Sequence, residues 1–165
     1  MTYMIAYIRD FCAEYGVVAE SFETSCPWSQ VASLCKNVKQ GIYDAGAVHG
    51  IKQNEIWVSF RVTQLYETGA AVYVYFTLGY RDFPDKVVDI YEDIEHRTRE
   101  AVFANGGSIS HHHGVGKLRK RFMERSFSPM NFEMLNGIKE RIDPKNIFAV
   151  NNTIYRLPGE QAYDE

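Results

Sequence analysis

A chain of 165 residues, 45% of them apolar, is long enough to bury a core without disulfide or metal crosslinks. Its 18 Lys and Arg residues against 21 Asp and Glu residues give a formal net charge of −3. This mildly acidic balance argues against general nucleic-acid binding, and no apolar run approaches the length of a membrane span.

The cysteines and the two ends of the chain bear on where the protein works. Cys12, Cys26 and Cys35 fit neither a zinc spacing nor a CxxC motif, so we expect reduced thiols in an intracellular protein. The first residues lack the basic and then apolar pattern of a signal peptide. The last four, AYDE, are not a peroxisomal address. We therefore expect any targeting signal to lie upstream of this sequence.

The first third of the chain predicts two helices around a short strand. Apolar residues recur at helical spacing over residues 2–15, and Gly16 is a plausible stop. Residues 17–23 are strand-like. A second helix is expected to begin at Ser25 or Cys26, with a proline in its first turn. Residues 41–54 contain three glycines and an asparagine, so a loop is predicted there.

The middle of the chain predicts a β-hairpin. Residues 56–66 and 70–80 are rich in alternating β-branched and aromatic side chains, and residues 67–69 form a short connection between them. Because side chains alternate along a strand, Tyr73 and Tyr75 are expected on one face of the second strand.

The last part of the chain predicts further helices. A third helix is expected from residue 82 to about residue 105, and two shorter ones near 117–125 and 129–141. No repeat or linker interrupts the chain. We therefore predict a single α+β domain over residues 1–165, an antiparallel sheet with helices packed on one face. A disordered tail is expected at about residues 155–165.

Residues 106–116, GGSISHHHGVG, are the most distinctive stretch of the sequence. Glycines allow a backbone to approach a ligand closely, and imidazoles can move protons near neutral pH. A metal site is disfavoured, because adjacent histidines point in different directions and no companion ligand motif is present. A polar loop with satisfied histidines is the plain alternative.

This stretch, extended through GVGKLRK to residue 120, closely resembles the signature of alkyl-dihydroxyacetonephosphate synthases, which are vanillyl-alcohol-oxidase-like flavoproteins. More distant members of that superfamily carry a Gly-Glu-His-Gly-type sequence here, so the triple histidine favours the synthase branch. Other segments resemble the family in the same order along the chain: RDF at 9–11, ESFETS with PW at 20–28, RVTQ with GA at 61–70, and DPKNIF at 143–148.

The resemblance implies roles for particular residues. The family's essential tyrosine corresponds to Tyr73 or, as second choice, Tyr75. Its histidine tract corresponds to His111, His112 and His113, which together with the tyrosines form the expected catalytic set. Arg9 matches an arginine that contacts substrate, and a planar guanidinium suits phosphate or carboxylate. Gly114 and Lys117 are expected beside the cofactor.

The resemblance also implies a reaction. These enzymes exchange the acyl chain of acyl-dihydroxyacetonephosphate for a long-chain fatty alcohol, using FAD without net redox change. The flavin is expected to be bound mainly by an N-terminal domain that this sequence lacks, since no glycine-rich dinucleotide-binding pattern is present. The resemblance allows a homodimer, a peripheral membrane association of the whole enzyme, and a peroxisomal or glycosomal location.

Two other functions are weighed against this one. The first is an FAD-linked alcohol or hydroxy-acid oxidase or dehydrogenase, which would pass a hydride to the flavin. The second is a non-catalytic ligand-binding module derived from the same domain. The histidine tract argues against the first, whereas the missing flavin domain favours the second for the chain taken alone.

Overall fold

The computed structural model describes the backbone of residues 2–150 and 152, and their side chains except those of residues 2–6 and 124. The chain divides into two compact units, residues 1–111 and residues 112–165. The predicted disordered tail lies outside the described residues. Among the described residues, no helix is both long and apolar enough to cross a bilayer.

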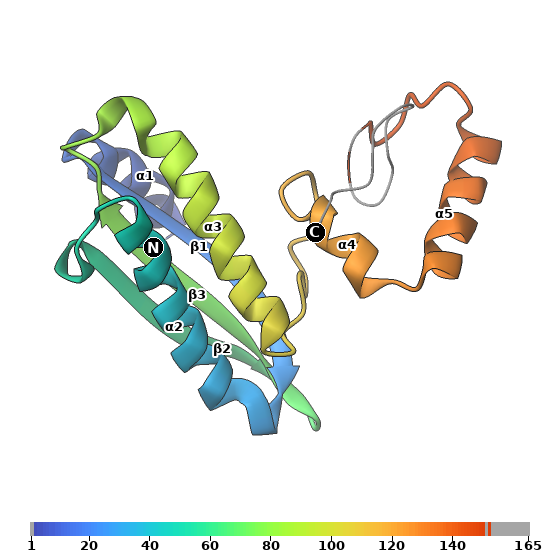
Figure 1. The fold of residues 1–165 in the computed structure, drawn as a ribbon, viewed down its shortest axis with the longest axis horizontal. Helices are drawn as coiled ribbons and strands as arrows, with labels where there is room; N and C mark the ends of the chain where they lie inside the picture. Colours follow the sequence, from blue (N-terminus) through green and yellow to red (C-terminus); the bar gives the residue numbers. More distant parts are fainter. Residues whose placement is uncertain (1, 151, 153–165) are drawn as a thin grey trace. The chain divides into compact units, whose positions relative to one another are not determined.

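The first unit consists of a sheet and three helices (Figure 1). In chain order these are α1 (Thr2–Glu14), β1 (Val17–Pro27), α2 (Val31–Val48), β2 (Ile56–Leu65), β3 (Gly69–Gly79) and α3 (Val87–Ala104), with single 3₁₀ turns at Trp28–Gln30, Gln53–Glu55 and Pro84–Lys86. The strands form one antiparallel sheet in the order β1-β3-β2. β3 is therefore the central strand, and it pairs with β1 along its whole length.

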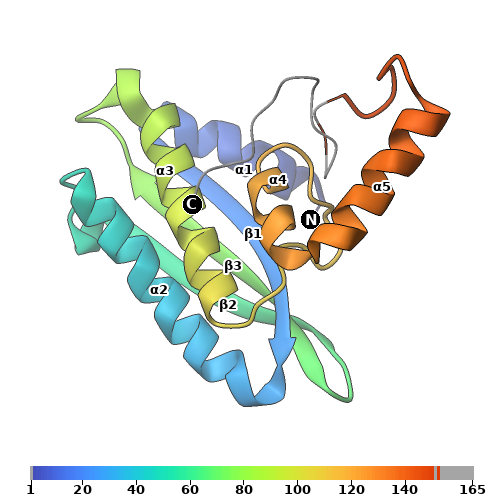
Figure 2. The same ribbon diagram turned by 45° about the vertical axis from the view of Figure 1, so that its right-hand side comes forward.

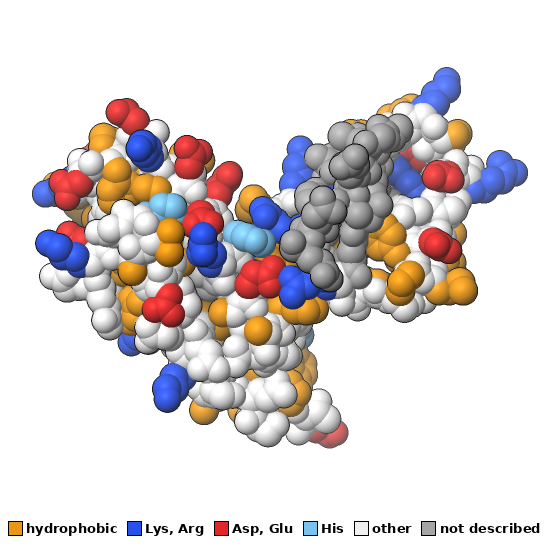
Figure 3. Space-filling view, viewed as in Figure 1, with side chains coloured by type: hydrophobic (Ala, Val, Ile, Leu, Met, Phe, Trp, Pro, Cys, Tyr) orange, Lys and Arg blue, Asp and Glu red, His pale blue; other side chains and the backbone are white. Residues whose placement is uncertain are grey.

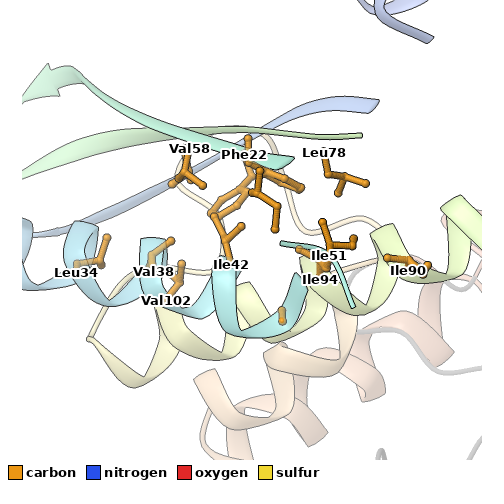
Figure 4. Close-up of a cluster of buried hydrophobic side chains, with 14 of the residues drawn as sticks. Phe22, Leu34, Val38, Ile42, Ile51, Val58, Leu78, Ile90, Ile94 and Val102 are labelled. Atoms are coloured by element: carbon orange, nitrogen blue, oxygen red, sulfur yellow. The ribbon is translucent and has the colours of Figure 1, made fainter. Parts of the chain in front are cut away.

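Helices α2 and α3 run side by side over one face of this sheet (Figures 1 and 2), while α1 contacts β1. The core lies between the sheet and the two helices, and Figure 4 shows Phe22, Val58 and Leu78 pointing from the strands towards the helices. The predicted α+β fold, an antiparallel sheet with helices packed on one face, is confirmed for this unit.

The alternation within β3 explains how one strand serves two surfaces. Val74, Phe76 and Leu78 are buried in the core, whereas Tyr73 and Tyr75, one position out of phase, are half-buried on the opposite face. The hairpin between residues 56 and 80 is confirmed, with β2 and β3 joined at residues 66–68.

The predicted end of the first strand and the predicted start of the second helix were wrong. Strand β1 does not end at Glu23 but continues to Pro27, because every residue of this stretch pairs with β3 as far as Gly69. Ser25 and Cys26 are therefore strand residues and not helix caps. The second helix begins at the turn Trp28–Gln30 and becomes α-helical at Val31.

The predicted loop at 41–54 was also wrong, since α2 continues to Val48. Gly41 and Gly46 lie within the helix and allow close packing, whereas Gly50 follows its end with a positive φ of 77°. A Cβ atom on Gly46 would lie 2.3 Å from Cδ1 of Ile56, at the start of β2. Absence of a side chain here lets the helix lie directly on the strand. The third helix, α3, follows the 3₁₀ turn at Pro84 as expected.

The second unit contains two short helices, α4 (Lys120–Ser126) and α5 (Pro129–Ile142), near the predicted positions. Ser128 caps α5, because its Oγ accepts a hydrogen bond from the backbone N–H of Asn131, and Pro129 occupies the first turn. After α5 the carboxylate of Asp143 accepts hydrogen bonds from the backbone N–H groups of Ile147 and Phe148, at 2.9 and 2.8 Å. The DPKNIF segment is thereby folded into a tight turn.

The surface of the first unit reflects the small net charge. Figure 3 shows acidic and basic side chains interspersed on the visible face of residues 1–111, without a large area of one sign. Cys12, Cys26 and Cys35 are free thiols, as predicted. Burial raises the pKa of the Cys26 thiol, and burial with the neighbouring Cys26 raises the pKa of Cys35.

Candidate active site

The side of the sheet away from α2 and α3 carries polar side chains. Residues that pair across antiparallel strands point to the same side, so the register identifies its members. We call it the tyrosine face, and it comprises Ser21 and Glu23 of β1, Ser59 and Arg61 of β2, and Tyr73 and Tyr75 of β3. Tyr73 lies between Glu23 and Arg61, whereas Tyr75 lies between the two serines.

Tyr73 and Tyr75 share this face, as their spacing predicts. Their rings stack with centroids 5.8 Å apart and planes inclined by 25°. Burial, and after it the negative charges of Glu23 and Tyr75, raises the pKa of the Tyr73 hydroxyl above its ordinary value of 10.0. Tyr73 is therefore protonated at neutral pH and suited to donate a proton. Accepting a proton would first require the loss of its own, which nearby positive charge favours.

Glu23 connects the tyrosine face to the histidine tract. Its carboxylate has no exposed surface. One oxygen accepts a hydrogen bond from the Ser110 hydroxyl at 3.1 Å, and the other accepts one from the backbone N–H of His111 at 2.8 Å. The start of the tract is thus bonded to a residue that pairs with Tyr73.

A second buried charge supports the same junction from α3. Arg99 is 1% exposed, and its Nε donates a hydrogen bond to Glu95 one helical turn earlier at 2.7 Å. Its Nη1 also donates to the backbone carbonyls of Glu23 and Ile109, at 3.4 and 3.3 Å. One guanidinium therefore joins the strand, the tract and the helix.

The imidazole of His111 lies in a cluster with Gln64, near the end of β2, and Tyr66, just after β2. His111 Nε2 is 2.7 Å from the Tyr66 hydroxyl and 3.2 Å from Oε1 of Gln64, and the Tyr66 hydroxyl donates to that same Oε1 at 2.7 Å. Because the tyrosine proton is directed at Gln64, the arrangement favours the His111 tautomer with its proton on Nε2.

A cleft of about 490 Å³ lies where β1 ends beside the hairpin. It is lined by residues of three segments, namely Ser25–Pro27, Tyr66–Ala70 without Glu67, and Gly106–Ser108 with His111. Gly107 is required for this geometry, because a Cβ there would lie within 2.8 Å of Val102, Leu34 and Thr24 side-chain atoms. The glycines of the tract were expected to let the backbone approach a ligand closely. Here Gly107 lets the backbone approach the protein's own core.

Arg9 lies beside the edge strand β1, and its main partner Glu20 is on the helix side of the sheet, since Glu20 pairs with Phe76. Its guanidinium forms an ion pair with Glu20 at 2.9 Å and lies 3.5 Å from the hydroxyl of Ser21, which pairs with Tyr75. The side chain is 52% exposed, so its remaining N–H donors are accessible. Arg9 is therefore not simply a solvent-facing residue of α1, because it also contacts β1.

The remaining predicted residues belong to the second unit, since the division of the chain falls between His111 and His112. The rings of His112 and His113 pack edge to face with centroids 4.6 Å apart. Gly114 has a positive φ of 82°, and its carbonyl accepts a hydrogen bond from Arg119 Nη1 at 2.7 Å. Lys117 is exposed just before α4.

The described residues fit the reacting end of a flavin site better than its phosphate end. Hydroxyls lie on the tyrosine face and an imidazole lies beside it, where a planar ring could be bound. The glycines of the tract are used differently, since Gly107 packs against the core and the Gly114 carbonyl bonds to Arg119. Within the described part of the chain, no three His, Cys, Asp or Glu residues are grouped to hold a metal ion.

Sequence reasoning missed the two residues that connect the site. Ser21 and Glu23 were noted within the ESFETS segment, yet neither was assigned a role. Their alternation with Phe22 was the available signal, because a buried Phe between two polar residues places both on the other face of a strand.

Comparisons with known proteins agree with the fold. Residues 1–152 match the family "FAD linked oxidases, C-terminal domain". The chain is 44% identical over 154 residues to alkyldihydroxyacetonephosphate synthase of Caenorhabditis elegans, which covers 93% of this chain and 26% of the relative. It is 29% identical over 145 residues to the Dictyostelium discoideum synthase, covering 88% and 23%. A solved structure of an alkyldihydroxyacetonephosphate synthase superposes with a TM-score of 0.61 at 22% identity, covering 89% of this chain and 22% of that one.

The chain therefore spans about a quarter of the length of the synthases that it resembles. The match over residues 1–152 covers nearly all of the described structure, including the whole tyrosine face and the histidine tract. On this match, the chain belongs to the family of C-terminal domains of FAD-linked oxidases.

Proposed function

We propose that this chain is the substrate-facing part of an FAD-dependent alkyl-dihydroxyacetonephosphate synthase, which exchanges the acyl chain of acyl-dihydroxyacetonephosphate for a long-chain fatty alcohol. The observation that carries the proposal is the junction at Glu23. It links a half-buried tyrosine pair to the first histidine of the tract within a domain 44% identical to such a synthase. This junction supports a proposal in which acid/base groups of two kinds act together.

The exchange requires a proton to be removed from the substrate and later returned. Tyr73 is the proposed acid/base, with Tyr75 as the second choice, and its raised pKa keeps the hydroxyl protonated at neutral pH. His111, whose Nε2 faces Tyr66 and Gln64, is proposed to relay a proton. His112 and His113 are the other proposed members of the catalytic set.

In the net reaction one carbon–oxygen bond breaks and another forms. The acyl chain leaves as a carboxylate, the alcohol oxygen bonds to the same carbon, and the alcohol proton is released. FAD, when bound, supplies a ring that takes part in this exchange without net redox change. Arg9 is proposed to bind the substrate phosphate, since its exposed guanidinium can still donate beyond its bond to Glu20.

The remaining assignments are part of the same proposal. FAD is bound mainly by an N-terminal domain of the whole protein, and Gly114 and Lys117 contribute from this chain. The reaction belongs to ether-lipid synthesis in a peroxisome or glycosome. The whole enzyme is proposed to form a homodimer and to associate peripherally with a membrane, because both its substrates carry long alkyl chains.

The test is an alkyl-exchange assay on the complete reading frame with FAD, using labelled hexadecanol and acyl-dihydroxyacetonephosphate. Tyr73→Phe and His112→Ala are compared with the parent, and Tyr43→Phe on α2 is the matched control because it removes a hydroxyl from a half-buried tyrosine of the core side. We expect ether product from the parent and from the control, and about a hundredfold less from the other two variants.

A second function, oxidation of an alcohol or hydroxy acid, is supported by the breadth of the matching family, whose name specifies oxidases. Flavin bleaching by such a substrate, without ether product from the parent, would establish it. The non-catalytic alternative predicts neither result. The 165-residue chain by itself is expected to retain no flavin after purification, and measurable absorbance near the flavin maximum would contradict that.

A further inference from the structure

Glu23 stands out as a fully buried carboxylate whose oxygens both accept hydrogen bonds from the histidine tract. Burying a carboxylate is unfavourable unless donors replace the lost water. Here the donors are the Ser110 hydroxyl at 3.1 Å and the His111 backbone N–H at 2.8 Å. Each bond joins residues more than 80 positions apart in the chain, so the contact fixes tertiary structure and not a local turn.

The bonds of Glu23 constrain the ring of His111. The backbone of His111 is held by Glu23, and its Nε2 is held 2.7 Å from the Tyr66 hydroxyl and 3.2 Å from Gln64. A histidine fixed at both its main chain and its ring tip has little freedom to change orientation. Since Glu23 also pairs with Tyr73, the same residue sets the place of the imidazole relative to the proposed acid/base.

Arg99 stabilises the same contact by bonding to main-chain carbonyl groups of the strand and of the tract. Its Nη1 donates to the carbonyls of Glu23 and Ile109, the residue just before Ser110. The guanidinium is in turn held by Glu95 at 2.7 Å. Glu23 is thus joined to the tract in two ways, directly through its carboxylate and, by way of Arg99, through its main-chain oxygen.

We propose that Glu23 is a positioning residue, which acts through His111 by fixing the main chain and imidazole of that histidine beside Tyr73. Nothing in the reaction requires Glu23 to touch the substrate. The inference rests on the proposed function for its effect on turnover, but the contact itself has consequences that are measured without turnover.

The first test is hydrogen exchange, followed by mass spectrometry on the complete reading frame. Glu23→Gln keeps the size of the side chain, but one oxygen becomes an NH₂ group that cannot accept a bond from either donor. We expect amide exchange in a peptide covering residues 109–113 to become about tenfold faster. Glu92→Gln, the same change at an exposed position of α3, is the control and leaves this peptide unchanged.

Unchanged protection of residues 109–113 in Glu23→Gln would overturn the proposal, whatever the reaction is. If that variant fails to fold, Ser110→Ala replaces it. This change removes one donor at a half-buried position, and a smaller rise in exchange, about threefold, is expected in the same peptide. No rise in Ser110→Ala would be equally decisive.

The second test is a double-mutant cycle in the alkyl-exchange assay. Glu23→Gln is expected to lower kcat about 10- to 100-fold with KM for the acyl substrate changed less than about twofold, because orientation and not binding is lost. In a His111→Ala background the same change is expected to cost less than about twofold more, because its effect passes through His111.

Each outcome points to one conclusion. Losses that multiply in the double variant would mean that Glu23 acts independently of His111, and the proposal would be wrong. Absence of ether product from the parent would instead count against the proposed function, and hydrogen exchange would still decide whether Glu23 holds the tract.

Discussion

Arg99 lies over the ring of Phe22, with its guanidinium carbon 4.2 Å from the ring centroid. Both side chains are almost completely buried, and they come from α3 and β1. A guanidinium in this position stacks on an aromatic ring while its N–H groups bond in its own plane. The core of the domain therefore contains a charge at the point where helix, strand and tract meet.

Replacing Arg99 with Leu is predicted to lower the free energy of unfolding by about 3–5 kcal/mol, because Glu95 and two carbonyls lose their buried donor. Urea unfolding followed by circular dichroism measures the change. Arg97→Leu is the matched control on the same helix. Arg97 is half exposed and pairs with Asp93, so a loss of at most about 1 kcal/mol is expected. Equal effects at the two positions would show that Arg99 is not the junction described here.

Gly107→Ala is predicted to destabilise the domain by about 1–3 kcal/mol, because its Cβ would lie 2.7–2.8 Å from three core side chains. Gly79→Ala, at the other end of the sheet, meets no atom within 4 Å and is expected to be neutral or slightly stabilising. Thermal unfolding of both variants beside the parent tests the contrast. A stable Gly107→Ala would mean that the tract can move away from α2 without cost.

The turn after α5 is predicted to open in acid. A hydrogen bond from Lys139, followed by the one from the Ile147 N–H, lowers the pKa of Asp143 to about 2 from its ordinary 3.8. A depressed pKa stabilises the turn above about pH 4, and this stabilisation is lost as pH falls towards 2. The amide chemical shifts of Ile147 and Phe148 should follow a midpoint near 2. Asp143→Asn should remove that transition, and a midpoint near 3.8 in the parent would contradict the contact.

Thiol reactivity is predicted to differ among the cysteines. Burial raises the pKa of Cys26 and Cys35, which reduces the thiolate fraction that reacts. Cys12, partly exposed on α1, should be alkylated at pH 7.5 at least about tenfold faster than Cys26. Peptide mapping after a timed reaction gives the three rates, and in denaturant they should become similar. Early modification of Cys26 would indicate that the cleft opens to solvent.

The hairpin and the third helix could be predicted from the sequence because their signals are local. Val74 and Phe76 alternate with Tyr73 and Tyr75, and the alternation alone separates core from polar face. The second helix could not be placed in the same way. Glycine is common in loops, so Gly46 suggests a loop when the sequence is read alone. Its contact with Ile56 depends on a strand that begins ten residues later.

The sequence proposes residues for the site but does not show how they are connected. Tyr73, Tyr75, Arg9 and His111 were identified through resemblance, whereas the bond between Glu23 and His111 joins residues 88 positions apart. The periodicity of apolar residues in the sequence cannot predict such a contact, because the contact depends on how the tract folds back onto the sheet. The roles of these residues and the extent of the domain stay predictions.

The indole N–H of Trp28 donates a hydrogen bond to the carbonyl of Tyr66 at 2.8 Å, which joins the end of β1 to the β2–β3 hairpin at the rim of the cleft. The chain contains two tryptophans, and the other, Trp57, lies near the opposite end of the sheet. A Trp57→Phe variant would therefore carry a single tryptophan, Trp28, bonded to Tyr66 at the rim of the cleft. Its emission would shift whenever a ligand or a neighbouring domain displaced the hairpin, giving an optical signal of occupancy that requires no label and no turnover.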